Sequence, residues 1–366
     1  MKILILGGTG AMGKHLVQKM KGTNNQVTVT SRRFFADKEN ISFIQGNAHD
    51  LDFVDNLLSR DFDVIVDFMA YGTEEFKLRY KKILENCGQY IFMSSSRVYA
   101  DSEQALTEKS LRLLDVCTDK EYLATDEYAL AKARQENLLR NSGRKNYTII
   151  RPYITYSENR LQLGVLEKES WLYRALKGRT IVFSNDIAYK YTTLTYGMDV
   201  ASAIVQLIGN EKAYGETFHI TSNQSYPWEK VLSWYLDAIE QYSGVRPRVK
   251  MEEKSSNLKS DRTKYQVKYD RYYNRRFDNG KISKFVDTSS FVAANTGLPQ
   301  CMDSFIKNQS FLYIDWKREA YYDRLTGECA SIKEMPTLKQ KIKYLIFRYI
   351  IFPYKLRIDN GTILYQ

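Results

Sequence analysis

The stretch KILILGGTGAMGKHLVQKM (residues 2–20) joins an apolar strand to a helix through a glycine turn. The run Lys2–Leu6 ends at Gly7, and Gly10 and Gly13 follow before an amphipathic segment. Glycines in such a turn let the backbone approach a pyrophosphate, and the next helix offers free N–H groups and the positive end of its dipole. Because the triplet lies between a strand and a helix, it predicts a dinucleotide-binding turn more strongly than a plain structural loop.

Downstream of this turn, strand-like and helix-like segments alternate, which predicts a parallel sheet wrapped by helices. Helices are expected at 12–20 and 127–139. The predicted strands are Lys2–Leu6, Val27–Thr30, Ile41–Ile44, Val64–Phe68, Tyr90–Met93 and Tyr147–Ile150.

A chain of 366 residues is long for one core, so two lobes are expected. We predict an α/β fold: a doubly wound parallel Rossmann sheet with a smaller C-terminal α+β substrate lobe. The predicted divisions are a Rossmann core at 1–165, interleaved segments returning to the core at 166–224, a substrate lobe at 225–310 and a basic, aromatic extension at 311–366.

The positive charge lies in the last third of the chain. The net charge is +11, and residues 241–366 hold 24 Lys and Arg against 13 Asp and Glu. Such a region suits an anionic substrate, RNA, a membrane surface or simply a solvated face. No apolar run is long enough to span a bilayer, and the four scattered cysteines indicate a reducing compartment, so a cytoplasmic protein is expected.

The end of the second strand bears on cofactor choice. NAD-binding proteins usually place an acidic residue there to bind the ribose hydroxyls. This chain has Ser31, Arg32 and Arg33 instead. Because arginine can hold a 2′-phosphate, NADP is favoured over NAD; the alternative is a pair of surface arginines.

The pattern Tyr-x-x-x-Lys places a phenol and an ammonium on one helical face, where the cation is expected to lower the phenol pKa for proton transfer. One pair lies between the serine-rich strand end FMSSSRVYA (92–100) and the strand YTIIRP (147–152), where α/β sheets bind ligands, and it is the predicted site. The four occurrences are Tyr128/Lys132, Tyr173/Lys177, Tyr226/Lys230 and Tyr313/Lys317.

At this point the sequence resembles the extended short-chain dehydrogenases/reductases of the nucleotide-sugar epimerase/dehydratase type. The resemblance covers about residues 1–310. The stretches that carry it are GGTGAMG (7–13), GNAHD (46–50), SSSRVY (94–99), YALAK (128–132), RPYITY (151–156), MDVASAI (198–204) and FDNGKI (277–282).

The resemblance implies roles for particular residues. Tyr128 would be the acid/base, Lys132 its partner, and Ser95 the third catalytic residue, with Ser94 and Ser96 as rivals. The implied cofactor residues, together with those argued above, are Gly7, Gly10, Ala11, Met12, Gly13, Ser31, Arg32, Arg33, Asn47, Ala48, Phe68, Met69, Ala70, Pro152 and Tyr153. The candidate substrate residues are Ser96, Arg160, Lys190 and Arg271, and no metal ligand is predicted.

Two departures from the family pattern reduce the number of reactions that this chain is expected to catalyse. Family dehydratases carry Asp-Glu after the catalytic Ser/Thr, whereas this chain has Ser96 and Arg97, which disfavours 4,6-dehydratase activity. Many epimerases carry a phosphate-binding arginine where this chain has Thr192. The resemblance implies a nucleotide-sugar epimerase acting through a transient keto sugar. The alternatives are an NADPH-dependent keto-sugar reductase and a non-catalytic RNA-binding relative, the latter disfavoured by the intact trio.

The segment 339–358 is apolar and basic, with Ile342, Leu345, Ile346 and Tyr349 near helical spacing. A helix docked on its own lobe is the favoured interpretation. Contact with an anionic membrane surface, which would make the protein membrane-peripheral, and cover for a partner subunit of a homodimer are the alternatives. No DNA partner is predicted.

Overall fold

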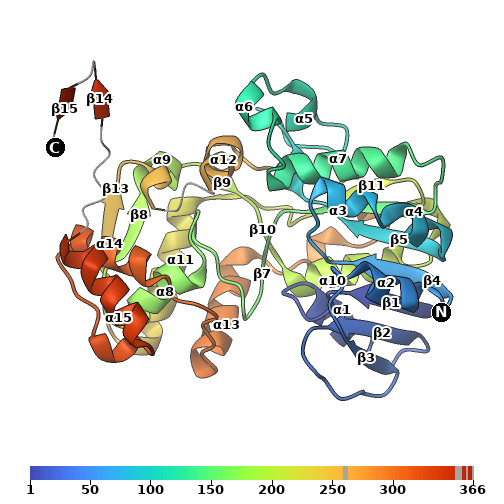
Figure 1. Ribbon diagram of the computed structural model, residues 1–366, viewed down its shortest axis with the longest axis horizontal. Helices are drawn as coiled ribbons and strands as arrows, with labels where there is room; N and C mark the ends of the chain where they lie inside the picture. The colour runs from blue at the N-terminus through green and yellow to red at the C-terminus, as the bar shows by residue number, and fades with distance from the viewer. Residues whose placement is uncertain (259–262, 351–356, 360–361, 365–366) are drawn as a thin grey trace.

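The first lobe is built around a seven-stranded parallel sheet. The computed structural model describes residues 1–258, 263–350, 357–359 and 362–364. The strand order β11-β6-β5-β4-β1-β2-β3 places β4 at the centre and β1 between β4 and β2, so that the chain winds outward from β1 in both directions (Figure 1). The strands are β1 (Lys2–Leu6), β2 (Gln26–Ser31), β3 (Ile41–Gln45), β4 (Phe62–Asp67), β5 (Cys87–Met93), β6 (Tyr147–Pro152) and β11 (Thr217–Ile220). All six predicted strands lie in this sheet, which confirms the doubly wound fold.

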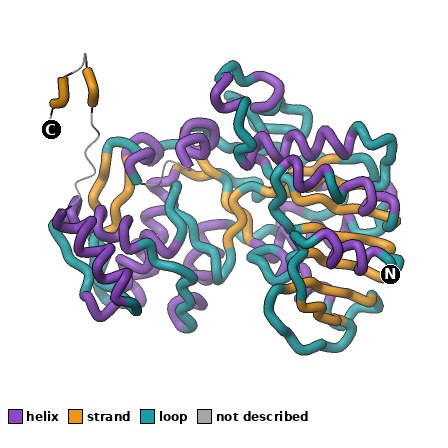
Figure 2. The backbone as a smooth tube through the Cα atoms, viewed as in Figure 1, coloured by secondary structure: helices purple, strands orange, loops and turns teal. Residues whose placement is uncertain are grey.

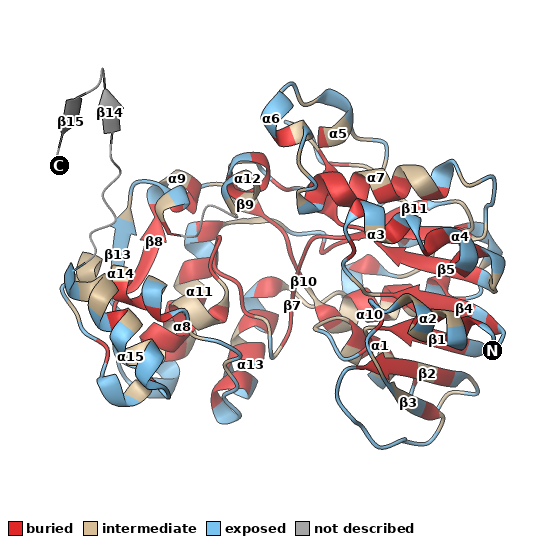
Figure 3. Ribbon diagram, viewed as in Figure 1, coloured by how far each residue is buried: buried red, intermediate tan, exposed pale blue. Residues whose placement is uncertain are grey.

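Both faces of the sheet are covered, because successive side chains of a strand point to opposite faces. Ile3 and Ile5 pack with α1 (Gly13–Met20) and α10 (Gly197–Leu207). Leu4 and Leu6 pack on the other face, under α2 (Leu51–Leu58), α3 (Thr73–Lys77), α4 (Tyr80–Glu85) and α7 (Tyr128–Arg140). These β1 side chains are fully buried, and Figure 3 shows the buried strands between helices whose outer faces are exposed.

Two short helices, α5 (Leu113–Val116) and α6 (Lys120–Leu123), are inserted between β5 and α7. A 3-10 turn at Ser96–Val98 follows β5 directly.

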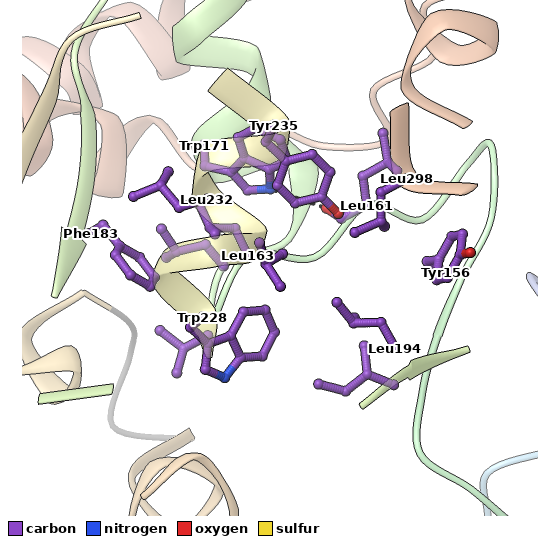
Figure 4. Close-up of a cluster of buried hydrophobic side chains, with 14 of the residues drawn as sticks. Tyr156, Leu161, Leu163, Trp171, Phe183, Leu194, Trp228, Leu232, Tyr235 and Leu298 are labelled. Carbon is purple, nitrogen blue, oxygen red and sulfur yellow. Dashed lines mark hydrogen bonds between the residues drawn. The ribbon is translucent and has the colours of Figure 1, made fainter. Parts of the chain in front are cut away.

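The second lobe packs around a separate apolar core that includes Trp171, Trp228 and Tyr235 (Figure 4). Short strands lie between the lobes (Figure 2). Among the short strands, β7 pairs parallel with β10, and β9 pairs antiparallel with β12. The elements are β7 (Ile154–Tyr156), α8 (Lys168–Leu176), β8 (Ile181–Ser184), α9 (Asn185–Ala188), β9 (Tyr191–Thr192), β10 (Leu194–Tyr196), β12 (Tyr226–Pro227), α11 (Trp228–Ser243), β13 (Val249–Glu252), α12 (Lys264–Gln266), α13 (Ala294–Lys307), α14 (Trp316–Thr326) and α15 (Leu338–Leu345).

The polar, tyrosine-rich segment 252–276 docks on the first lobe over the part that the structure describes. Tyr269 stacks on Tyr122 of α6 with ring centroids 4.3 Å apart, and its hydroxyl donates to Asp119 at 2.6 Å. Lys268 pairs with the same carboxylate at 2.8 Å. This segment therefore joins the second lobe to the first through side-chain contacts.

The C-terminal extension packs on the second lobe through α14, α15 and a π-helical turn at Ile346–Ile350. Tyr344 is fully buried and its hydroxyl donates to Asp323 at 2.6 Å. The favoured docked helix is thus present for 338–350, whereas 351–356 of the predicted 339–358 segment lies outside the described residues. Strands β14 (Arg357–Asp359) and β15 (Thr362–Leu364) form a hairpin. No helix in the described parts of the chain is long and apolar enough to cross a membrane.

Candidate active site

The glycine turn after β1 has the close backbone packing that a dinucleotide site requires. Gly7 has φ +69°, and a Cβ there would lie 2.9 Å from the Met69 sulfur. A Cβ on Gly13 would lie 2.7 Å from the Gly8 Cα, so the start of α1 packs directly on the turn. The Gly7 N–H donates to Thr30 Oγ1 at 3.0 Å, which ties the turn to β2. Gly7 and Gly13 therefore serve different purposes, one conformational and one steric.

A cavity of about 860 Å³ opens beside this turn. Most of the predicted cofactor residues line it, namely Gly7, Gly10, Ala11, Ser31, Arg32, Arg33, Asn47, Ala48 and Met69, together with the predicted substrate residue Arg160. The remaining predicted cofactor residues lie outside its lining; they are Met12, Gly13, Phe68, Ala70, Pro152 and Tyr153. A nicotinamide dinucleotide fits this donor set, because the cavity combines a glycine turn, a helix N-terminus and several cations.

Sequence reasoning missed several residues that line the cavity, among them Lys14, His49, Lys168 and Leu312. Lys14 belongs to the first turn of α1, and its place directly after the glycine triplet is a signal that could have found it. Lys168 and Leu312 come from the second lobe. They lie more than 150 residues from the turn in sequence, so no local pattern predicts that they face it.

At the end of β2, Arg32 and Arg33 are both exposed at the cavity. The Arg33 N–H donates to Ser31 Oγ at 3.1 Å, which fixes the turn that presents them. Within the portion of the chain that the structure describes, neither guanidinium group forms a hydrogen bond or an ion pair. Both are therefore free to bind an anionic group.

The predicted catalytic trio comes from two elements at the carboxyl end of the sheet. Ser95 follows β5 and is 7% exposed, and its Oγ accepts from the Arg97 N–H at 3.2 Å. Tyr128 is the first residue of α7 and is partly exposed. Lys132 is buried one turn later, where its Nζ donates to the Met69 carbonyl at 3.3 Å. The other three Tyr-x-x-x-Lys pairs belong to the second lobe.

Burial raises the pKa of the Tyr128 phenol. The positive charges of Arg97 and Arg160 and a hydrogen bond from Ser95 oppose this effect. The Tyr-x-x-x-Lys pattern predicts that Lys132 lowers the pKa of the phenol, whereas the cations that lower it most in the structure are Arg97 and Arg160. Burial also lowers the pKa of Lys132 to about 8, against the attraction of Asp67 and Glu136.

The predicted substrate residues are placed differently from one another. The Ser96 hydroxyl is fully buried and donates to the Arg151 carbonyl at 2.8 Å. Arg271 is 2% exposed, and it bonds Asp270 and the Gly164 carbonyl, the latter at 2.9 Å. Lys190 is half-buried beside β9. Of the four candidates, only Arg160 lines the cavity.

Three comparisons relate this arrangement to known proteins. The sequence model described as "NAD dependent epimerase/dehydratase family" matches residues 3–221. Chloroplast stem-loop binding protein of 41 kDa b from Arabidopsis thaliana is 30% identical over 240 residues. That match covers 61% of this chain and 59% of the plant protein, so it spans less than two thirds of the relative's length.

The fold is also similar to those of solved nucleotide-sugar enzymes. UDP-glucuronic acid 4-epimerase from Bacillus cereus, in complex with UDP-glucuronic acid and NAD, aligns with a TM-score of 0.62 at 18% identity, over 84% of this chain and 99% of that chain. dTDP-glucose 4,6-dehydratase from Bacillus anthracis, in complex with NAD, aligns with a TM-score of 0.63 at 16% identity, over 84% and 97%. At these identities the likeness concerns the fold.

Proposed function

This chain belongs to the NAD-dependent epimerase/dehydratase family, and we propose that it is an NAD(P)-dependent nucleotide-sugar oxidoreductase, with epimerisation through a transient keto sugar as the leading reaction. One observation carries the proposal. Ser95 follows β5, Tyr128 and Lys132 lie one turn apart on α7, and Lys132 donates to the carbonyl of Met69, a residue that lines the cavity beside the glycine turn. Acid/base groups next to a dinucleotide site are what hydride transfer at a sugar carbon requires.

In this proposal the side chains handle the proton. Tyr128 accepts the proton of the sugar hydroxyl that is oxidised and later returns it. Ser95 hydrogen-bonds the same oxygen and orients it toward the phenol. Lys132 contributes a positive charge between Met69 and α7. The nicotinamide ring, when bound, supplies the hydride acceptor.

We propose NADP as the preferred cofactor. The support is the pair of unpaired guanidinium groups at Arg32 and Arg33, which can bind a 2′-phosphate bidentately. The Bacillus cereus and Bacillus anthracis enzymes are NAD complexes, so this preference would separate the chain from those proteins.

The alternative reaction of the same class is keto-sugar reduction, which NADP suits well. Two assays separate the reactions. An epimerase converts nucleotide sugars with catalytic amounts of cofactor and no net change in absorbance, whereas a reductase consumes NADPH in proportion to product. Mass spectrometry of ligands retained on the purified protein would identify the nucleotide and the cofactor together.

We propose that 4,6-dehydration is not among its reactions. The residues after Ser95 are Ser96, whose hydroxyl is committed to the Arg151 carbonyl, and Arg97, which stays protonated. Two carboxylates elsewhere in the lobe are already engaged. Glu158 pairs with Lys14 at 2.7 Å, and Glu108 accepts from the His219 N–H at 3.1 Å.

RNA binding is the second candidate function, because the plant relative is a stem-loop binding protein and the last third of this chain is basic. A gel-shift titration with a stem-loop RNA at low and high salt tests it. Tight binding that falls steeply with salt, together with no turnover of nucleotide sugars, would favour this candidate over the enzyme.

A further inference from the structure

Arg97 contacts both hydroxyl-bearing residues of the predicted trio. Its backbone N–H donates to Ser95 Oγ at 3.2 Å, and its guanidinium carbon lies 5.3 Å from the centroid of the Tyr128 ring. A cation at this distance over an aromatic face is attracted by the ring. Lys132, by contrast, directs its ammonium to the Met69 carbonyl and the Phe92 ring.

Carboxylates from both lobes hold this guanidinium in place. On the first lobe, Glu127 accepts from the Arg97 terminal nitrogen at 2.5 Å. Glu127 is itself fixed, because it also accepts from the Ala129 N–H at 2.8 Å and the Tyr122 hydroxyl at 3.2 Å. On the second lobe, Asp270 approaches the Arg97 Nε to 3.9 Å.

Asp270 is a fixed partner, since it is 1% exposed and bonds Arg271 and Arg275, the latter at 3.0 Å. It belongs to the segment that docks on α6. Arg97 therefore lies between a carboxylate beside α7 and a carboxylate of the segment that docks on α6.

We propose that Arg97 is a positioning residue for the reaction assigned to Tyr128: it holds a positive charge over the phenol ring so that the hydroxyl releases its proton more readily. The proposal rests on the proposed function for its role in catalysis, but its electrostatic content is independent of turnover. The alternative interpretation is that Arg97 only stabilises the fold, through its ion pairs with Glu127 and Asp270.

The charges around the phenol agree with the electrostatic role. Burial raises the pKa of Tyr128, Arg97 is the largest opposing influence, and Arg160 is the next. The carboxylate of Glu127 acts in the other direction. Burial alone would lower the pKa of Arg97, but Glu127 and Asp270 outweigh it and raise the pKa, so the guanidinium keeps its charge wherever the phenol titrates.

The test measures the Tyr128 phenol directly. Carbon NMR of protein labelled at tyrosine Cζ reports ionisation, and the Tyr128→Phe variant identifies the signal. At a fixed pH of about 9.5, Arg97→Gln should reduce the ionised fraction about tenfold, while Arg97→Lys, which still carries most of its charge at this pH, should stay near the wild type. Arg134→Gln is the matched control, because Arg134 lies on α7 with Tyr128 and pairs with Asp126 at 3.1 Å.

Hydride transfer provides the second measurement. Its pH profile in Arg97→Gln should move upward by about one pH unit, with cofactor affinity unchanged. Arg97→Met, which keeps the aliphatic stem, is the second neutral variant if Arg97→Gln does not fold. An unchanged phenol titration in either folded neutral variant, or equal effects of Arg97→Gln and Arg97→Lys, would overturn the proposal. Absence of hydride transfer in the wild type would contradict the proposed function, and the titration would still decide the role of Arg97.

Discussion

Lys132 of α7 donates a hydrogen bond from its Nζ to the carbonyl oxygen of Met69, 3.3 Å away in the segment that follows β4. The same nitrogen lies 4.6 Å from the centroid of the Phe92 ring on β5. One buried ammonium thus links three elements of the first lobe at the edge of the cofactor cavity. The effect of this buried charge on the stability of the protein can be measured.

Replacing Lys132 with methionine should alter how stability depends on pH. Because the pKa of the folded-state Lys132 is lowered to about 8, the unfolded chain holds this proton more tightly between pH 8 and its ordinary pKa of about 10.5. The free energy of unfolding of the wild type should therefore rise over this window, by about 3 kcal/mol from this group. Lys132→Met should lose that rise, which denaturant unfolding at pH 7, 8, 9 and 10 would measure. A rise of equal size in the variant would contradict the assignment.

The Arg32→Ala/Arg33→Ala double variant should discriminate between cofactors. If these arginines hold a 2′-phosphate, NADP affinity should fall about tenfold to a hundredfold, because charge-assisted contacts are worth about 1.5–3 kcal/mol. NAD affinity should barely change, since it lacks that group. Calorimetric titration with both cofactors measures this. Equal affinities for NADP before and after substitution would make the arginines ordinary surface residues.

Nucleoside diphosphate hexoses should not be dehydrated by this protein. Elimination needs an acid for the departing hydroxyl and a base for the neighbouring proton, and Ser96 and Arg97 supply neither. Incubation of candidate nucleotide hexoses with saturating cofactor, followed by mass spectrometry, should show no product lighter by one water. Accumulation of such a product would return dehydration to the list of reactions.

The C-terminal extension should contribute to stability through Arg174. This fully buried guanidinium bonds Asp323 at 2.8 Å and Glu319 at 2.9 Å on α14, and burial raises the pKa of Glu319 to about 7. Arg174→Met leaves carboxylates buried without this partner, which should cost about 3–5 kcal/mol of unfolding free energy.

The matched control is Arg246→Met. In the wild type the Arg246 guanidinium pairs with Asp237 at 2.5 Å on the surface, and surface ion pairs contribute at most about 1 kcal/mol to the free energy of unfolding. Chemical denaturation of the two variants compares them. Similar losses in both would show that the buried cluster does not hold the extension.

The parts of the fold that could be predicted are those that produce a local pattern in the sequence, such as an apolar run or a glycine turn. The apolar run Lys2–Leu6 and the glycines after it are sufficient to predict β1, the turn and α1, and the position of Tyr128 between two strands separates it from its three rivals. The features that could not be predicted are contacts between residues that are distant in the sequence. Neither the bond from Tyr269 to Asp119 nor the approach of Asp270 to Arg97 leaves a periodic signal, because each joins segments more than a hundred residues apart.

The residues of the candidate site also fall into two groups, those that the local sequence predicts and those that it does not. The glycine turn and the serine-rich stretch after β5 were predicted from strand ends, and the family resemblance then singled out Ser95. The hydrogen bonds of Ser96 and Arg271 to backbone carbonyls could not be predicted from residue type. In the sequence, Arg97 is informative only because it stands where family dehydratases carry a carboxylate. The approach of its guanidinium group to the Tyr128 ring depends on where the 3-10 turn after β5 places Arg97 relative to α7.

The most direct test of the account is the Tyr128→Phe variant, assayed for hydride transfer with nucleotide sugars and for cofactor affinity in parallel. Only the hydroxyl is lost, so cofactor binding should be retained while the rate falls at least about a hundredfold. Tyr173→Phe, Tyr226→Phe and Tyr313→Phe, which alter the same pattern in the second lobe, should leave the chemical step intact. Near-normal turnover by Tyr128→Phe would contradict the central claim that this phenol carries the proton.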